Sequence, residues 1–148
     1  MPAIFDLLTE DHAKVKGLLA QVQETGDGAG KTRDKLLAEI KKDLEIHAEF
    51  EEQVFYPKAR ATTGLEDVIE DSLEEHSEAK ELLEKLEAMN STSKEWLSTV
   101  EELADAIEHH AQDEEEKLFP KARKTMEKAD AEAMGEQYLK VKQKALAS

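Results

Sequence analysis

Two copies of one residue pattern constrain this chain more than any other feature of its sequence. In each copy a histidine stands 34 or 35 residues ahead of a His-x-x-x-Glu sequence. The first copy consists of His12, His47 and Glu51, and the second of His76, His110 and Glu114. The flanking sequence repeats too, since HAEFEEQVFYPKAR is echoed by HAQDEEEKLFPKAR. A repeat that keeps histidines and carboxylates at matched places predicts one site shared by two halves of the protein.

Apolar residues recur every three or four positions along four long segments, which is the spacing of one face of an α-helix. The repeated histidines lie inside these apolar stripes, as in the run Ile4, Leu8, His12, Val15, Leu19 and Val22. Stretches rich in Gly, Ser, Thr or Asn separate the segments at residues 25–30, 60–64 and 90–93. The sequence therefore predicts an all-α fold, an antiparallel up-down four-helix bundle.

Several local signals mark where the helices should begin, bend or end. Thr63-x-x-Glu66 and Thr92-x-x-Glu95 fit the capping box and predict helix starts. Pro57 and Pro120 each follow a histidine by ten residues and should stop or kink the second and fourth helices. Beyond Pro120 an additional C-terminal helix is predicted from a shared apolar face, formed by Met134, Tyr138, Val141 and Ala145.

The length of 148 residues fits one domain, because a chain of this size can bury about two thirds of its unfolded surface. We expect a single domain over residues 1–148, with the first repeat at about 3–60, the second at about 64–123 and the C-terminal helix at about 126–146. Charged residues make up 37% of the chain and it has only 3 prolines, a composition typical of amphipathic helices.

The net charge of −15 disfavours nucleic acid and anionic membranes as partners, because both require a clustered basic surface. The sequence has no cysteine, so a metal would need nitrogen and oxygen ligands. It also has no apolar run of the roughly 18 residues that a membrane span needs, and no basic and then apolar leader at its N-terminus. The cytoplasm is therefore the expected location.

In an antiparallel bundle the four histidines reach one level, because His12 and His47 stand at similar distances from the loop between their helices. Within each His-x-x-x-Glu the imidazole and the carboxylate share a helix face, one turn apart. Burying these ionisable groups without partners would cost several kcal/mol, and a bound cation supplies the missing partner. Four histidines and two glutamates suit two first-row metals bridged by the carboxylates, with positions left open for a small molecule.

Other metal and catalytic motifs are missing from the sequence. A ferritin-like bundle needs Glu-x-x-His on two helices, and the chain contains no such sequence. A zinc metalloprotease would need His-Glu-x-x-His, which is absent as well. The remaining alternative is a purely structural bundle with hydrogen-bonded core histidines, and four histidines at matched positions argue against it.

The combined pattern of His12, His47-x-x-x-Glu51, His76 and His110-x-x-x-Glu114 resembles the hemerythrin-like, or HHE cation-binding, domain over roughly residues 3–146. This resemblance implies an up-down four-helix bundle that holds a non-haem di-iron centre. It also implies two iron ions with an oxo or hydroxo bridge. The four histidines would be terminal ligands, and Glu51 and Glu114 would bridge the metals.

One departure from the family pattern bears on function. Oxygen-carrying hemerythrins have an extra histidine on the third helix, in a His-x-x-x-His pair, whereas Ser72 and Lys80 stand four residues either side of His76. With fewer protein ligands both irons are expected to be exposed, which favours peroxide, superoxide or nitric oxide chemistry over reversible oxygen carriage. This expectation would fail if another side chain supplied the missing donor, and the conceivable ones are Tyr138, Tyr56, Glu75 and His109.

Three polar residues near the repeated pattern have supporting roles at most. Asp113 and Glu52 are candidate acceptors for hydrogen bonds that orient a ligand imidazole. His109 lies about 100° around the helix from His110 and is expected on the surface or behind a ligand.

Two functions from different classes are consistent with these features. The first is a non-haem di-iron protein that binds or turns over small oxygen or nitrogen species, namely O2, H2O2 and NO, with an electron donor as a candidate partner. Whether it is an enzyme that decomposes peroxide or handles nitric oxide is left open. The alternative is a non-catalytic sensor of oxygen, iron or redox state, or an iron-binding storage module.

Overall fold

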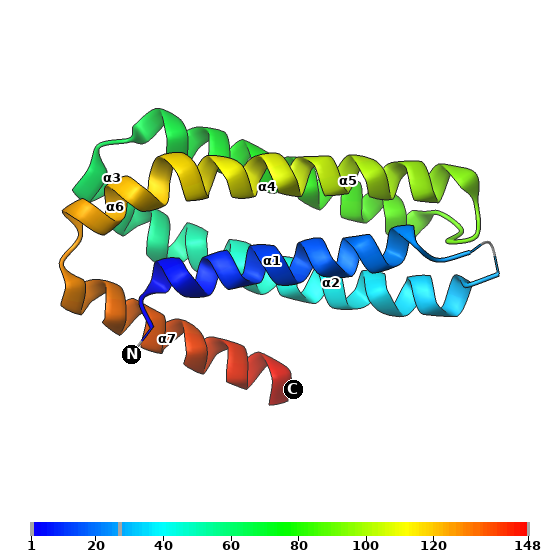
Figure 1. Cartoon of the computed structure of the whole chain (residues 1–148), viewed down its shortest axis with the longest axis horizontal. Coiled ribbons are helices and arrows are strands. Elements are labelled where there is room, and N and C mark those ends of the chain that lie inside the picture. Colours follow the sequence, from blue (N-terminus) through cyan, green and yellow to red (C-terminus); the bar gives the residue numbers. More distant parts are fainter. Residues whose placement is uncertain (1, 27, 148) are drawn as a thin grey trace.

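The computed structural model describes residues 2–26 and 28–147. Its long helices are α1 (Ile4–Gln23), α2 (Gly30–Phe50), α4 (Glu66–Ala88), α5 (Lys94–Asp113) and α7 (Lys128–Ala147). The first four run antiparallel as a bundle, and α7 packs beside α1 and α2 near the N-terminus (Figure 1). The predicted all-α bundle with an additional C-terminal helix is confirmed. Asp27, in the first predicted loop, lies outside the described residues. None of the helices in the described ranges is long and apolar enough to cross a membrane.

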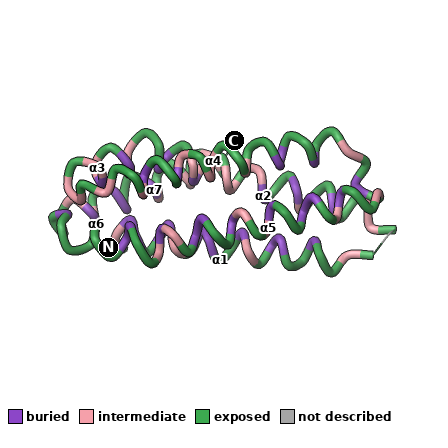
Figure 2. Tube along the Cα trace, turned by 90° about the horizontal axis from the view of Figure 1, so that it is seen from above, coloured by how far each residue is buried: buried purple, intermediate pink, exposed green. Residues whose placement is uncertain are grey.

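The interior contains two apolar clusters, one towards each end of the bundle. The first includes Leu8 and Phe55, and the second includes Val15 and Trp96. His12 stands between Leu8 and Val15 on the buried face of α1, so the histidine layer separates the two clusters. Buried positions recur along every long helix (Figure 2). The polar layer is therefore enclosed by apolar packing above and below it.

Neither proline ends its helix. The second helix widens into a π segment, Glu51–Phe55, and continues as α3 (Tyr56–Thr63). The fourth does the same through Glu114–Leu118 and α6 (Phe119–Thr125). Proline has no N–H and its ring crowds the preceding turn, so a wider turn ahead of it relieves the conflict. Both π segments begin at the glutamate of a His-x-x-x-Glu sequence.

The predicted capping boxes lie at the right loops but at the wrong residues. α5 begins after Ser93, whose hydroxyl accepts a 3.2 Å hydrogen bond from the Trp96 N–H. The Thr92 hydroxyl instead donates to the Asn90 side chain at 2.7 Å, which removes it from the helix end. Thr63 does not cap α4, because its hydroxyl donates to the Ala59 carbonyl of the preceding helix at 2.7 Å.

A buried arginine holds together the end of the bundle where the loops containing Thr25 and Ser91 lie. Nothing in the sequence pointed to this role. Arg33 donates to the Thr25 hydroxyl at 2.7 Å and to the Ser91 carbonyl at 2.8 Å, so one side chain ties two loops together. Its guanidinium also lies 5.6 Å from the centre of the Trp96 ring. These contacts fix the loops from which the four long helices run towards the histidine layer.

α7 docks through a face of small and large residues. Ala131, Met134, Gly135 and Tyr138 are buried. A Cβ on Gly135 would lie 2.3 Å from the Pro2 carbonyl oxygen, so only glycine allows this approach to the N-terminal segment. The predicted apolar face is wrong at Val141, which is 40% exposed because the helix diverges from the bundle towards its C-terminus.

Candidate metal centre

The structure brings the six residues of the repeated pattern into one layer. Each long helix of the bundle supplies one imidazole, and the two π segments supply the carboxylates. The set is His12, His47, His76, His110, Glu51 and Glu114. Glu51 and Glu114 are completely buried, and the exposed fraction of the His76 side chain, the largest of the four histidines, is 9%.

Each glutamate faces one histidine from its own helix and one from the other repeat. Oε1 of Glu51 lies 3.1 Å from Nε2 of His47 and 3.0 Å from Nε2 of His76. Oε1 of Glu114 lies 3.2 Å from Nε2 of His110 and 3.0 Å from Nε2 of His12. The imidazoles form two closest pairs, with ring centres 5.0 Å apart for His12 and His47 and 4.8 Å apart for His76 and His110. The layer thus contains two neighbouring pairs of imidazoles, each beside a glutamate.

Several polar atoms in this layer have no hydrogen-bond partner within the described part of the chain. They are Oε2 of Glu51 and Nε2 of His47 and His110, whose contacts to glutamate oxygens at 3.1 and 3.2 Å lack hydrogen-bond geometry; all three atoms are buried. Leaving such groups without a partner costs about 1–3 kcal/mol each. Imidazole nitrogens and carboxylate oxygens that converge with free lone pairs are the donor set of a first-row metal site, so the residues fit a bound metal.

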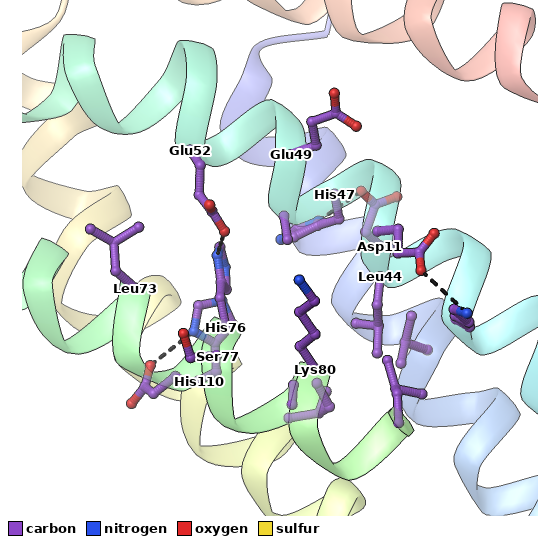
Figure 3. A pocket seen from close by; sticks show the side chains of 18 of the residues that line it. Asp11, Leu44, His47, Glu49, Glu52, Leu73, His76, Ser77, Lys80 and His110 are labelled. Atoms are coloured by element: carbon purple, nitrogen blue, oxygen red, sulfur yellow. Dashed lines mark hydrogen bonds and ion pairs between the residues drawn. The ribbon is translucent and has the colours of Figure 1, made fainter. Parts of the chain in front are cut away.

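A second ring of carboxylates holds the outer nitrogen of every imidazole. Nδ1 of His47 lies 2.9 Å from an Asp11 oxygen. In the other three histidines of the layer, Nδ1 lies 2.8 Å from a glutamate oxygen. The other pairs are His76 with Glu52, His110 with Glu75, and His12 with Glu115. Figure 3 shows Glu52 and Asp11 beside their histidines. A carboxylate that accepts the Nδ1 proton fixes the ring and leaves the Nε2 lone pair for a metal.

The outer carboxylates follow the sequence repeat. Asp11 and Glu75 each precede the first histidine of a repeat and bind the second histidine of the same repeat. Glu52 and Glu115 each follow the glutamate and bind the first histidine of the other repeat. The sequence signal was an acidic residue at both flanking places in both repeats.

Two of the three supporting residues predicted from sequence behave as expected. Glu52 is confirmed as an acceptor for His76. His109 lies on the surface, with a side chain 68% exposed, and Glu75 lies behind it at 3.3 Å. Asp113 is wrong as an acceptor for a site imidazole, because its carboxylate faces Lys117 and His109, each at 3.3 Å.

The Tyr56 hydroxyl lies between the two buried glutamates. It donates to Oε2 of Glu114 at 2.7 Å and lies 3.1 Å from Oε1 of Glu51. Burial raises the pKa of Tyr56 well above its usual value, and the negative charges of Glu114 and Glu51 raise it further. The phenol is therefore neutral and donates its one proton to Glu114, with Glu51 also within hydrogen-bond distance.

The structure describes all four conceivable extra donors, and their contacts show which of them reaches the central carboxylates. Tyr138 donates to Asp11, and Glu75 accepts from His110. His109 projects from the surface. Of these four side chains, Tyr56 is the one that reaches Glu51 and Glu114.

The π turn explains why Tyr56 faces the site. Five residues of regular α-helix would place Tyr56 about 140° around the axis from Glu51. Here the Tyr56 N–H donates to the Glu51 carbonyl, five residues back, which brings the two side chains to the same face. Phe119 occupies the matching place in the second repeat and stacks on His12, with ring centres 6.1 Å apart. The phenol is thus an asymmetric feature of a repeated site.

The charges in the layer shift the ionisation of its members. Burial by itself lowers the pKa of His47 and His110, but the neighbouring glutamates and outer carboxylates raise both pKa values well above the usual range. Burial and the charge of Glu114 raise the pKa of Glu51, whereas His47 and His110 lower it to a net value of about 2. Without a metal, protons on the imidazoles offset the carboxylate charges.

A cavity of about 820 Å³ reaches the layer between α2 and α4 and is lined by His47, His76 and His110 among others. The side chain of Lys80 extends towards the gap between His47 and His76 (Figure 3). Ser72, on the other side of His76, is buried. The two positions four residues from His76 are thus Ser72 and Lys80, and the cavity is lined by Lys80 and by all four histidines of the layer.

Comparison with known proteins now identifies the family. The family model described as the hemerythrin HHE cation binding domain matches residues 3–122. The chain belongs to the HHE cation-binding family. Its histidine and glutamate cluster is compatible with metal binding, as the family description requires. α7 lies beyond the matched residues of the HHE domain.

Related proteins cover the chain almost completely. It is 33% identical over 141 residues to a DNA nickase of Nostoc sp. (strain PCC 7120), a match that covers 95% of the chain but 39% of that protein. An uncharacterised hemerythrin-like protein of Schizosaccharomyces pombe is 25% identical over 144 residues, which are 96% of the chain and 70% of that protein. A crystal structure of an HHE cation binding domain-containing protein from Mycobacterium kansasii covers 99% of the chain and is itself 90% covered, with a TM-score of 0.84 and 22% identity. This last similarity shows the fold.

Proposed function

We propose that this HHE domain binds two iron ions and uses them to bind or turn over small oxygen or nitrogen species such as H2O2, O2 and NO. The terminal ligands would be His12, His47, His76 and His110, and the bridging ligands Glu51 and Glu114. The observation that carries the proposal is the convergence of these donors while three of their buried atoms have no hydrogen-bond partner among the described residues. Two cations would offset the charge of the carboxylates and use these lone pairs.

The residues around the proposed ligands have separate tasks. Iron would supply redox chemistry and coordination positions for a small molecule. The outer carboxylates hold the imidazoles with Nε2 pointing inward, as the 2.8 Å contact between His110 and Glu75 illustrates. Tyr56 holds a proton at its hydroxyl beside both glutamates. The cavity beside His76 gives a small molecule access, which fits turnover better than protected oxygen carriage.

Sustained consumption of a small molecule tests this proposal. Protein loaded with ferrous iron and freed of excess metal should consume many equivalents of H2O2 per chain by disproportionation, or many equivalents of NO when a chemical electron donor is supplied. Glu114→Gln should abolish consumption because it removes a proposed bridging ligand. Glu116→Gln, at an exposed place on the same π segment, is the matched control and should retain it. Equal rates for the two variants would contradict the proposed site.

A non-catalytic sensor or iron-binding module is the second candidate. One observation favours it, because the Nostoc relative carries the matching region within a protein of which this chain spans 39%. A domain of that kind can report iron or redox state to the rest of a longer protein. Binding of one small molecule per site without further consumption would select this candidate. We propose no DNA-directed function, because the net charge of −15 opposes duplex binding.

A further inference from the structure

Helix α7 makes polar contacts to the centre although it lies outside the residues matched by the family. The Tyr138 hydroxyl donates to Oδ2 of Asp11, and the Lys142 ammonium donates to Oδ1 of the same carboxylate. Tyr138 is fully buried and Asp11 is 7% exposed. Both oxygens of one buried outer carboxylate are therefore held by α7.

Asp11 transmits these contacts to a proposed ligand. Its Oδ2 also lies 2.9 Å from Nδ1 of His47, so a continuous set of hydrogen bonds runs from α7 to that imidazole. The Lys142 ammonium lies 4.9 Å from the centre of the Tyr138 ring, which keeps the two donors together. A carboxylate with both oxygens engaged has little freedom to rotate, so the imidazole that it orients has little freedom as well.

Within the described residues, no helix holds the matching carboxylate of the second repeat in this way. Glu75 corresponds to Asp11 and lies 2.8 Å from Nδ1 of His110. Its other oxygen faces His109 at 3.3 Å, and the His109 side chain is 68% exposed. One half of the centre is thus supported by a docked helix, and the other by the exposed His109 with Asp113 beside it.

We propose that α7 is a positioning element for one of the two metal positions. Through Tyr138, Lys142 and Asp11 it fixes His47, so that a metal held by the His12 and His47 pair is released more slowly than one held by the His76 and His110 pair. This inference rests on the proposed two-iron function. Tyr138 and Lys142 act through Asp11 and are positioning residues.

The positive charge of Lys142 would have the opposite effect on metal affinity if charge were decisive. The Lys142 ammonium repels a nearby cation and partly neutralises the charge of Asp11. If charge were decisive, removal of the ammonium would tighten metal binding. Loss of an outer partner that orients a ligand instead weakens metal binding by about 10–100-fold in typical sites. The direction of change in a Lys142→Met variant therefore separates positioning from charge.

Coupling of this kind is reciprocal. If docked α7 raises the affinity for one metal, that metal must favour the docked helix by the same factor. Amide hydrogen exchange over residues 128–147 of the wild-type chain should therefore be slower with iron bound than after chelation. Equal exchange in the two states would overturn the coupling, and this measurement needs no variant.

Metal release from the full chain tests the one-sided effect. Ferrous protein is mixed with an excess of a coloured iron chelator, and the wild type should release two equivalents in two phases. Tyr138→Phe removes one donor, and Lys142→Met removes the other donor together with its charge. Gly135→Ala should displace α7 through its 2.3 Å clash with the Pro2 oxygen without removing a polar group. Lys140→Met is the matched control, since Lys140 is 74% exposed and pairs with Glu136 on the same helix.

The expected result is that Tyr138→Phe, Lys142→Met and Gly135→Ala accelerate one phase by about 10-fold or more and leave the other phase and the control unchanged. Unchanged or slower release in Tyr138→Phe or Lys142→Met would overturn the inference, as would equal acceleration of both phases. A wild-type chain that binds fewer than two irons would instead overturn the proposed function itself, so the two failures are distinguishable.

Discussion

The hydroxyl of Tyr56 lies 2.7 Å from Oε2 of Glu114, which belongs to the other half of the repeat. The same hydroxyl lies 3.1 Å from Glu51, so one neutral donor connects both buried carboxylates. The matching residue of the second repeat is Phe119, which has no hydroxyl. The two halves of the centre therefore differ at this position, because one has a phenol and the other a phenyl ring.

Tyr56→Phe should destabilise the metal-free protein. The substitution leaves Oε2 of Glu114 buried without its donor, which costs about 1–3 kcal/mol in the free energy of unfolding. Urea denaturation of the chelator-treated protein measures this loss. A variant as stable as the wild type would show that the Tyr56 contact contributes nothing to the metal-free fold.

Glu75→Gln should weaken metal binding without touching a proposed ligand. Glutamine does not provide the charged acceptor that Nδ1 of His110 now has at 2.8 Å, and such a loss lowers metal affinity by about 10–100-fold. Competition with a chelator of known affinity gives the value. Glu74→Gln removes the same charge from an exposed neighbouring position and should bind metal like the wild type. Equal loss in both variants would assign the effect to overall charge.

The metal-free protein should be most stable in mildly acidic solution. The folded pKa values of His47 and His110 are raised, against burial, by Glu51 and Glu114, so their contribution is full below the unfolded value of 6.5 and is lost as the pH rises through the folded values. Glu51 has a folded pKa of about 2, so its contribution is present above the unfolded value of 4.5 and is lost as the pH falls.

Denaturation of the chelator-treated chain at about pH 5.5 and about pH 8.5 checks this sign, with a lower free energy of unfolding expected at the higher pH. Iron-loaded protein should not show the alkaline loss, because metal replaces the protons on the imidazoles. A metal-free protein that gains stability between these two conditions would contradict the proposed charge balance.

Iron should stabilise the fold, because a ligand that binds the native state alone shifts unfolding by mass action. At a free metal concentration about 100 times the dissociation constant the gain is about 2.7 kcal/mol. His47→Ala should lower both the iron content and the iron-dependent rise in melting temperature. Thermal unfolding with and without iron measures this, and a variant that retains the full rise would exclude His47 from the site.

The convergence of the six central residues could be predicted because, in a regular helix, the number of residues between two positions sets their relative height and direction. His47 and Glu51 share a face through their four-residue spacing, and the distances of His12 and His47 from a common loop set their level. The apolar stripes that bury them were equally visible. Helix periodicity therefore carried both the bundle and the central layer.

Tyr56 was foreseen only as one of four conceivable donors, because its orientation depends on the π turn. A regular helix would point it away from Glu51, and the sequence shows only Pro57 as a sign of the wider turn. Asp11 and Glu115 were not foreseen for a different reason. The chain has 35 acidic residues, so two further carboxylates stand out only when both repeats are compared at the flanking positions.

The most direct test of the central claim is the metal content of the chain, measured by elemental mass spectrometry on protein expressed with added iron and purified without a chelator. We expect about two iron ions per chain, held by four imidazoles and two carboxylates. Glu114→Gln should reduce this number and Glu116→Gln should not. A well-folded wild-type chain that contains no metal would contradict the account and favour a purely structural bundle.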